Sequence, residues 1–193
     1  GLEVPRYTLA ESSGDAVSFA EQTGFPVVAK VVSPEVIHKT EVSGVEVGIQ
    51  TPEEVEEAFA RFSGINGFAG MLVEQMIEGT ELIVGAKTDS QFGPVVLIGM
   101  GGVGVEIYQD SSIRMAPLRE NDVKSMVSQL KARQLIEGFR GSEAVNMKKL
   151  TELVVRFSEL AVELEEEFES IDLNPVICTG DRCVIADARI ILK

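Results

Sequence analysis

The chain carries, at residues 26–45, the stretch PVVAKVVSPEVIHKTEVSGV. This stretch predicts a strand, Val27–Val32, in which one lysine, Lys30, stands among valines. A polar loop follows, and near its tip lies His38, the only histidine of the chain. A buried lysine is costly unless an anion meets it, so the lysine and the histidine together indicate a phosphate ligand. The alternative is an edge-strand lysine and a surface histidine, because most polar residues in loops have no chemical role.

Composition limits the kind of partner that the protein binds. The 193 residues suffice for one sizeable core or for two subdomains that share a cleft. The formal net charge of -14 argues against a nucleic acid or an anionic membrane as the partner. No apolar run has the length of a membrane span, and no signal peptide opens the chain. The sequence begins at Gly1 without a methionine, so we expect a part of a longer protein.

Two cysteines near the C-terminus indicate a hairpin. Cys178 and Cys183 flank the pair Gly180-Asp181 in the segment VICTGDRCVIA, and a two-residue turn would place them directly opposite each other. Two cysteines are too few for a disulfide scaffold or for a metal site of their own. We therefore expect buried thiols and a reducing, cytoplasmic environment.

The same hairpin register places a second polar pair side by side. Counting back from the turn, Asn174 faces Asp187, and Asp172 faces Arg189. An amide oxygen beside a carboxylate suits Mg²⁺, which needs only one or two protein ligands when a nucleotide supplies the others. The alternative is a hydrogen-bonded polar pair without metal.

Between these two ends, the pattern predicts alternating helices and strands. Helices are expected at the ranges 15–23, 52–64, 121–133 and 146–169, the second of them capped by Thr51 with Glu54. Strands are expected at the ranges 27–32, 45–49, 71–77, 81–88 and 95–98, and a closing hairpin at 171–191. The glycine-punctuated link at residues 64–70 is the expected boundary between an N-terminal subdomain, 1–70, and a C-terminal subdomain, 71–193.

A glycine-rich segment, GMGGVG at residues 99–104, matches the spacing of a dinucleotide-binding loop. That fold requires a helix to begin at the third glycine, where its N-terminus meets the pyrophosphate. Here VEIYQDSSIRM follows, which suits a strand, so a Rossmann fold is excluded.

A carboxylate in an apolar strand is the remaining candidate. Glu74 lies in MLVEQMI, and Glu81 follows after a glycine. Such a segment can bind an adenine through its backbone and a ribose hydroxyl through the second acid. The alternative is an alternating strand with one wet face.

In this order, a strand lysine, a strand glutamate and an Asn/Asp hairpin resemble the nucleotide site of the ATP-grasp fold. More specifically, the chain resembles the β subunit, or C-terminal ligase domain, of NDP-forming acyl-CoA synthetases such as ADP-forming acetyl-CoA synthetase. The resemblance covers nearly the whole chain and rests on PVVAKVVSPEVIHKTEVSGV, MLVEQMIEGTELIVGAKTD, FGPVVLIGMGGVGVE, RMAPL and IDLNPV. It implies an α/β ATP-grasp fold of two subdomains with ATP or ADP in the cleft between them.

The resemblance also implies a role for each candidate residue. Lys30 would hold the nucleotide phosphates, and Glu81 would bind the ribose. Glu74 and the following backbone at Gln75 and Met76 would meet the adenine. Asn174 and Asp187 would be the metal ligands that bind Mg²⁺. His38 would be the phosphohistidine.

The implied reaction is acyl-CoA + ADP + phosphate = acid + ATP + CoA. In such enzymes a histidine of a CoA-binding domain takes the phosphoryl group from an acyl phosphate, and the histidine of the ATP-grasp part passes it to ADP. A CoA-binding α subunit or domain is therefore the expected partner, so the chain would be part of a hetero-oligomer or of a longer chain. Two alternatives stay open: a non-catalytic regulatory ATP-grasp-like module of a protein acyltransferase, and another ATP-grasp carboxylate ligase.

Overall fold

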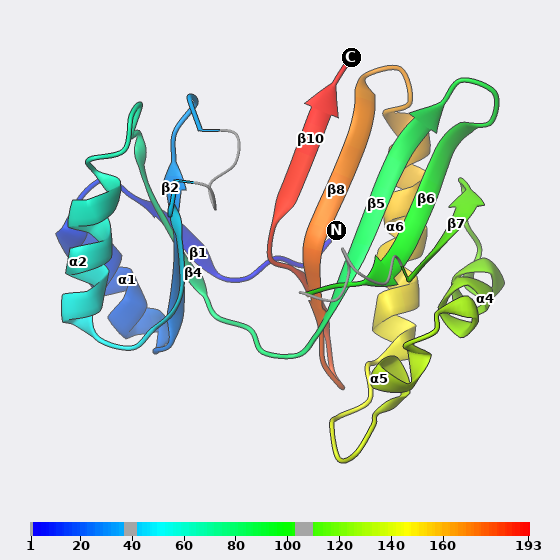
Figure 1. The fold of residues 1–193 in the computed structure, drawn as a ribbon, viewed down its shortest axis with the longest axis horizontal. Coiled ribbons are helices and arrows are strands. Elements are labelled where there is room, and N and C mark those ends of the chain that lie inside the picture. Colours follow the sequence, from blue (N-terminus) through cyan, green and yellow to red (C-terminus); the bar gives the residue numbers. More distant parts are fainter. Residues whose placement is uncertain (1, 37–41, 103–109) are drawn as a thin grey trace. The chain divides into compact units, whose positions relative to one another are not determined.

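The computed structural model describes residues 2–36, 42–102 and 110–193 (Figure 1). They form two compact units. The N-terminal unit is Pro5–Ile77, and the C-terminal unit is Glu78–Lys193 together with the first residues up to Val4. The expected boundary at residue 70 falls at the start of a strand that pairs within the N-terminal unit, so the structure divides the chain seven residues later.

The N-terminal unit is one antiparallel sheet with two helices on one of its faces (Figure 1). The strand order is β1-β4-β2-β3. The elements are β1 (Tyr7–Ala10), α1 (Ser13–Thr23), β2 (Val27–Val32), β3 (Val45–Ile49), α2 (Pro52–Phe62) and β4 (Gly70–Gln75). Only β1 was not predicted, because its four residues, YTLA, are too few for a period-2 pattern to stand out.

Alternation along β2 decides which of its residues face the helices. Val27, Ala29 and Val31 are fully buried and belong to the core that also holds residues of α1 and α2. Because side chains alternate across a strand, Lys30 projects from the opposite face of the sheet. The core of this unit therefore fixes the face on which the lysine lies.

The helix starts form as the sequence predicts. The Ser12 hydroxyl accepts a hydrogen bond from the Asp15 N–H, and the Thr51 hydroxyl accepts one from the Glu54 N–H. The Glu54 carboxylate in turn accepts the Gln50 N–H at 2.7 Å, one residue before the cap. These bonds satisfy amides that the first helical turn leaves without partners.

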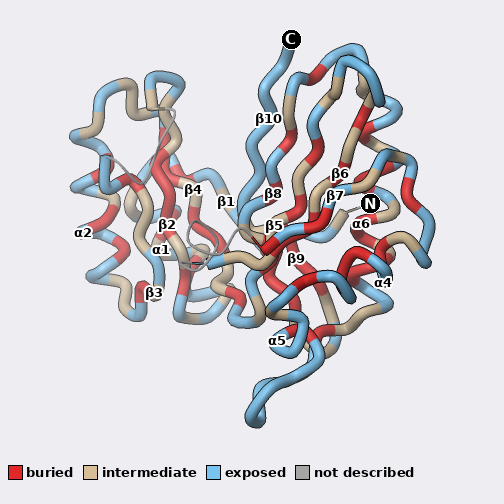
Figure 2. The backbone as a smooth tube through the Cα atoms, turned by 45° about the vertical axis from the view of Figure 1, so that its right-hand side comes forward, coloured by how far each residue is buried: buried red, intermediate tan, exposed pale blue. Residues whose placement is uncertain are grey.

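The C-terminal unit is a larger antiparallel sheet of order β10-β8-β5-β6-β7, with β9 also pairing to β8. Its strands are β5 (Thr80–Asp89), β6 (Gly93–Met100), β7 (Ser111–Met115), β8 (Phe168–Cys178), β9 (Cys183–Ile185) and β10 (Ala188–Leu192). Its helices are α4 (Glu120–Gln129), α5 (Arg133–Glu137) and α6 (Met147–Glu163). The long α6 crosses one face of this sheet, and buried residues alternate along the strands (Figure 2).

Three helices end earlier than the sequence predicts, and α2 does so by only two residues, at Phe62. The expected helix 121–133 is α4, whose cap at Leu130 has extended backbone, and α5 is a separate short helix. The expected helix 146–169 starts at its Asn146 cap as predicted but ends at Glu163. Phe168 is buried as expected, but it begins β8 and reaches the same core from the sheet. A buried phenylalanine at this position continues the apolar stripe whether it lies on the helix or on the following strand. The sequence pattern could therefore not locate the end of the helix.

The C-terminal hairpin has the predicted register. Cys178 pairs with Cys183, and Val176 pairs with Ile185. Beyond the short interruption between β9 and β10, Asp172 pairs with Arg189 in the same register. The long β8 thus carries β5 along one edge and β9 and β10 along the other.

None of the helices in the described part of the chain combines the length and the apolar character needed to cross a bilayer.

Candidate functional site

In the N-terminal unit, the structure brings two predicted site residues together. Lys30 Nζ lies 2.7 Å from the Glu74 carboxylate, and the two side chains are only 9% and 10% exposed. They reach each other diagonally across β2 and β4, where Lys30 pairs with Leu72 and Glu74 pairs with Val28. The sequence predicted that an anion, expected to be a phosphate, meets this lysine. In the described residues, the Glu74 carboxylate is an anion that lies beside it, and the phosphate contact stays a prediction.

The strand β4 ends one residue after Glu74. Gln75 still pairs with Val27, and its N–H donates to the Arg6 carbonyl at 2.8 Å. Met76 is half-buried and lies in no strand or helix. Outside the sheet, a backbone has polar groups that strand pairing does not use, as the expected adenine contact requires.

In the C-terminal unit, Glu81 lies at the beginning of β5 beside the start of the glycine segment. The Gly101 N–H donates to the Glu81 carbonyl at 2.7 Å. A Cβ added at Gly101 would come within 2.7 Å of the Glu81 backbone, so only glycine allows this approach. The Glu81 side chain itself is exposed.

Asn174 and Asp187 face each other across the hairpin as predicted. The Asn174 N–H donates to the Asp187 carbonyl at 3.1 Å, and the Ala186 N–H donates to the Pro175 carbonyl at 3.0 Å. Both residues are exposed, and their neighbours Leu173 and Val176 are buried in the core. The backbone therefore sets an amide and a carboxylate opposite each other.

This donor set fits Mg²⁺, because both side chains offer hard oxygen atoms. Within the described residues, no three His, Cys, Asp or Glu side chains gather into a metal cluster.

A third carboxylate, Asp172, lies next to this pair. Partial removal from water raises its pKa above the ordinary value, and the negative charge of Asp187 adds to that rise. The guanidinium of Arg189, directly across the ribbon, opposes it. The sequence placed Asp172 opposite Arg189, and in the structure the charges of both Arg189 and Asp187 act on it.

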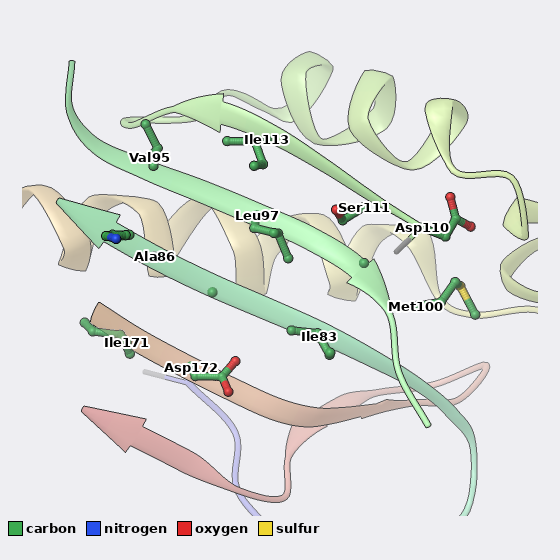
Figure 3. A pocket seen from close by; sticks show the side chains of 13 residues that line it. Ile83, Ala86, Val95, Leu97, Met100, Asp110, Ser111, Ile113, Ile171 and Asp172 are labelled. Atoms are coloured by element: carbon green, nitrogen blue, oxygen red, sulfur yellow. The ribbon is translucent and has the colours of Figure 1, made fainter. Parts of the chain in front are cut away.

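The open face of the C-terminal sheet is hollowed beside Asp172. A concavity of about 520 Å³ is lined by residues of β5, β6, β7 and β8. Ile83, Leu97 and Asp172 project from this face (Figure 3), and Gly85 lies between Leu97 and Asp172 across the sheet. A glycine there leaves room that a side chain would fill. One apolar side and one acidic edge suit a ligand that combines an apolar ring with metal-neutralised anionic groups.

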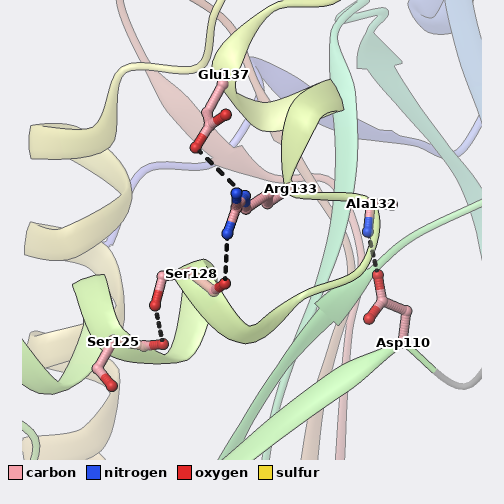
Figure 4. Close-up of polar contacts among 6 residues, drawn as sticks. All are labelled: Asp110, Ser125, Ser128, Ala132, Arg133 and Glu137. Carbon is pink, nitrogen blue, oxygen red and sulfur yellow. Dashed lines mark hydrogen bonds and ion pairs between the residues drawn. The ribbon is translucent and has the colours of Figure 1, made fainter.

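Asp110, at the rim of the hollow, had no role in the sequence prediction. It is buried, and its carboxylate accepts the N–H of Lys131 at 2.7 Å and of Ala132 at 2.8 Å. Figure 4 shows the bond from Ala132. The Asp110 carbonyl accepts the Met100 N–H at 3.1 Å. Asp110 thus ties the α4–α5 connection to the end of β6. Its position after the glycine segment was the only signal for it, and a single aspartate in a loop is too common to interpret.

The predicted residues therefore fall into two groups. Lys30, Glu74, Gln75 and Met76 belong to the N-terminal unit, and Glu81, Asn174 and Asp187 belong to the C-terminal unit. His38 lies outside the described residues.

Comparison with known proteins gives a family match over almost the whole chain. The model of the ATP-grasp domain matches residues 1–192. The β subunit of the ADP-forming acetate–CoA ligase I of Pyrococcus furiosus is 38% identical over 200 residues, which cover 100% of this chain and 86% of that subunit. The ADP-forming 4-hydroxybutyrate–CoA ligase of Nitrosopumilus maritimus is 36% identical, over 98% of this chain but only 28% of the longer ligase.

A solved structure matches equally well. It is acetyl-coenzyme A synthetase 1 of Ca. Korarchaeum cryptofilum, 41% identical, with a TM-score of 0.86 over 100% of this chain and 86% of that one. That structure holds coenzyme A and Mg-AMPPCP, and its phosphohistidine segment points towards the nucleotide-binding site.

Proposed function

Because the chain belongs to the ATP-grasp family, and within it to the β subunits of ADP-forming acetate–CoA ligases, we propose that it is the nucleotide-binding part of an ADP-forming acyl-CoA synthetase. In this role it transfers a phosphoryl group between a histidine and ADP. The observation that carries the proposal is the extent of the match, which includes all of this chain and most of a β subunit.

The metal pair supports the proposal from geometry. Asn174 and Asp187 would hold Mg²⁺ from opposite strands of one ribbon. The bound cation would neutralise the negative charge of the nucleotide phosphates. Asp172 and Arg189 adjoin the pair and set the charge around it.

Lys30 is the proposed phosphate-binding cation of the N-terminal unit. Its ion pair with Glu74 would hold the ammonium in one position on the sheet before a nucleotide arrives. Since the Glu74 carboxylate holds Lys30, the adenine contact falls mainly to the backbone at Gln75 and Met76. Glu81, exposed at the start of β5, would accept a ribose hydroxyl.

His38 is the proposed phosphoryl carrier. An imidazole is nucleophilic at neutral pH, and its phosphoramidate can phosphorylate ADP. A β-phosphate oxygen of ADP attacks the phosphorus, the bond from phosphorus to the imidazole nitrogen breaks, and ATP forms. The protein has little covalent chemistry to perform, so positioning and charge neutralisation dominate.

The protein needs a partner domain or subunit for the complete reaction. Some relatives carry this part within a chain more than three times as long, and others carry it as a separate β subunit. We propose that the partner binds CoA, forms the acyl phosphate and delivers the phosphoryl group. This chain alone would not turn over acyl-CoA.

The proposal is tested by incubating the protein with Mg²⁺ and ATP radiolabelled on its γ-phosphate. Wild type should acquire an acid-labile, base-stable phosphate, and His38→Ala should acquire none while keeping its circular dichroism spectrum. Equal labelling of the two proteins would contradict the role of His38.

A further inference from the structure

The proposed phosphoryl transfer makes no use of the two cysteines, Cys178 and Cys183. Both are free and buried, 1% and 4% exposed, and they are the only cysteines of the chain. They face each other across the β8–β9 hairpin, one pair beyond its two-residue turn. Side chains directly opposite each other on an antiparallel ribbon have Cβ atoms only about 4.5 to 5.5 Å apart. The two sulfur atoms are therefore neighbours in the folded protein.

The register of the hairpin favours a bond between them. The Thr179 N–H donates to the Arg182 carbonyl at 2.8 Å, so the pair that flanks the turn is hydrogen-bonded. The next pair, Cys178 and Cys183, is then of the non-hydrogen-bonded kind, in which the Cα atoms are only about 4.5 Å apart. Disulfides accept Cα separations of about 4.4 to 6.8 Å, so closing this bond needs little movement of the backbone.

One of the two cysteines borders a hollow at the surface. Cys183 lines a small surface hollow of about 80 Å³, together with residues of α6 and of the N-terminal segment. The charged groups of this hollow are two cations, Lys149 and Arg156, and two carboxylates, Glu3 and Glu152. A polar hollow of this size admits a molecule as small as hydrogen peroxide, since a water molecule takes about 30 Å³.

We propose that Cys178 and Cys183 form a reversible cross-strand disulfide when a peroxide enters this hollow. The Cys183 sulfur attacks one peroxide oxygen, the O–O bond breaks, and a sulfenic acid and water form. The Cys178 sulfur then attacks the Cys183 sulfur and expels a second water. In sum, two thiols and one hydrogen peroxide give one disulfide and two waters. A dithiol reductant restores the thiols.

The disulfide would join the two strands of the hairpin covalently, one residue pair away from its turn. The same ribbon carries Asn174 and Asp187 four residues further along each strand. The disulfide itself does not depend on the proposed function, because its formation is read from thiols and mass alone.

The experiment exposes the whole chain to hydrogen peroxide under native conditions and then counts thiols after unfolding. Wild type should lose both thiols, should lose two hydrogens by mass spectrometry without dimerising, and should regain both thiols with dithiothreitol. Cys178→Ser should give a sulfenic acid at Cys183 that dimedone traps. Cys183→Ser should keep its buried Cys178 thiol.

Two results would overturn the proposal. One is a wild-type protein whose thiols survive peroxide and are still titratable after unfolding. The other is oxidation that joins separate chains or adds oxygen to single cysteines without an intramolecular disulfide.

Discussion

Lys30, a candidate site residue, depends on a buried ion pair. Its side chain projects from the sheet face opposite the helices, yet it is 91% removed from solvent beside Glu74. A charge so buried is tolerated only with a partner of opposite sign. The sequence predicted the need for an anion, but it could not identify Glu74, because the pairing of β2 with β4 joins residues more than forty positions apart.

Replacing Glu74 tests the energetic part of this statement. Glu74→Gln removes the carboxylate 2.7 Å from the buried ammonium and should lower the free energy of unfolding by about 3 kcal/mol in urea denaturation. Glu120→Gln is the control, since its ion pair with Lys124 is largely exposed and should contribute less than about 1 kcal/mol. Equal effects of the two substitutions would mean that burial does not strengthen the Lys30 pair.

Asp172 predicts a pH dependence of stability. Its pKa is raised in the folded protein, mainly by burial, so the folded state binds its proton more tightly than the unfolded chain does. This contribution to stability is present below the unfolded value and is lost as the pH rises through the folded-state pKa. Asp172→Asn should therefore gain stability relative to wild type at about pH 7, and the gain should shrink towards about pH 4.

Asp89 is the matched control for Asp172, with the opposite sign. The N–H groups of Gln91 and Phe92 bind its carboxylate and lower its pKa. Asp89→Asn should thus lose stability at neutral pH, and the loss should diminish as the pH falls. The pH dependence is followed by urea denaturation. If the two substitutions changed the stability in the same direction at neutral pH, the direction of the pKa shift would be wrong for at least one of the two carboxylates.

Among the elements, the closing hairpin is the one that the sequence predicted best. Its register follows from the two-residue turn alone, because local turn geometry fixes every later pair. The interruption between β9 and β10 did not disturb that register. The pairing of Asn174 with Asp187 could therefore be predicted before the fold was known.

Helix ends and isolated short elements were predicted less well. The apolar stripe of α6 runs on into Phe168, which is buried from β8, so periodicity overran the true end at Glu163. Strand β1 is recognisable only through its pairing with β4, and α5 has only five residues. Such elements depend on contacts distant in sequence, which no local pattern contains.

The core stripe of α6 makes a prediction about stability. Phe157 is fully buried against the larger sheet, and Phe157→Ala should lower the free energy of unfolding by about 3 to 5 kcal/mol. Val162, on the same helix and 38% exposed, provides the control, and Val162→Ala should cost much less. Thermal or urea unfolding of both variants measures the difference. Comparable losses would show that α6 does not pack as described.

The hairpin also makes a prediction about metal binding. Asn174→Ala and Asp187→Ala each remove one oxygen ligand and should weaken Mg²⁺-dependent nucleotide binding by at least about 10-fold in calorimetric titration. Asp181→Asn changes an exposed acid at the turn of the same hairpin and should leave the affinity unchanged. If both alanine variants kept the wild-type nucleotide affinity, this ribbon would not be the Mg²⁺ site.

On the scale of the whole molecule, two compact units divide the candidate residues between them. The N-terminal unit holds Lys30 beside Glu74, and the C-terminal unit holds the Asn174/Asp187 pair and a hollowed sheet face. The formal charge of -14 makes local neutralisation by Lys30 and Mg²⁺ a requirement for binding a polyphosphate.

The central claim is that the chain passes a phosphoryl group from a histidine to ADP. The direct measurement takes wild-type protein carrying radiolabelled phosphate, frees it of nucleotide, and adds Mg²⁺ with ADP, or with AMP as the control. The account predicts that the label leaves the protein and appears in ATP with ADP only. Label that stays on the protein, or that is released only as inorganic phosphate, would contradict it.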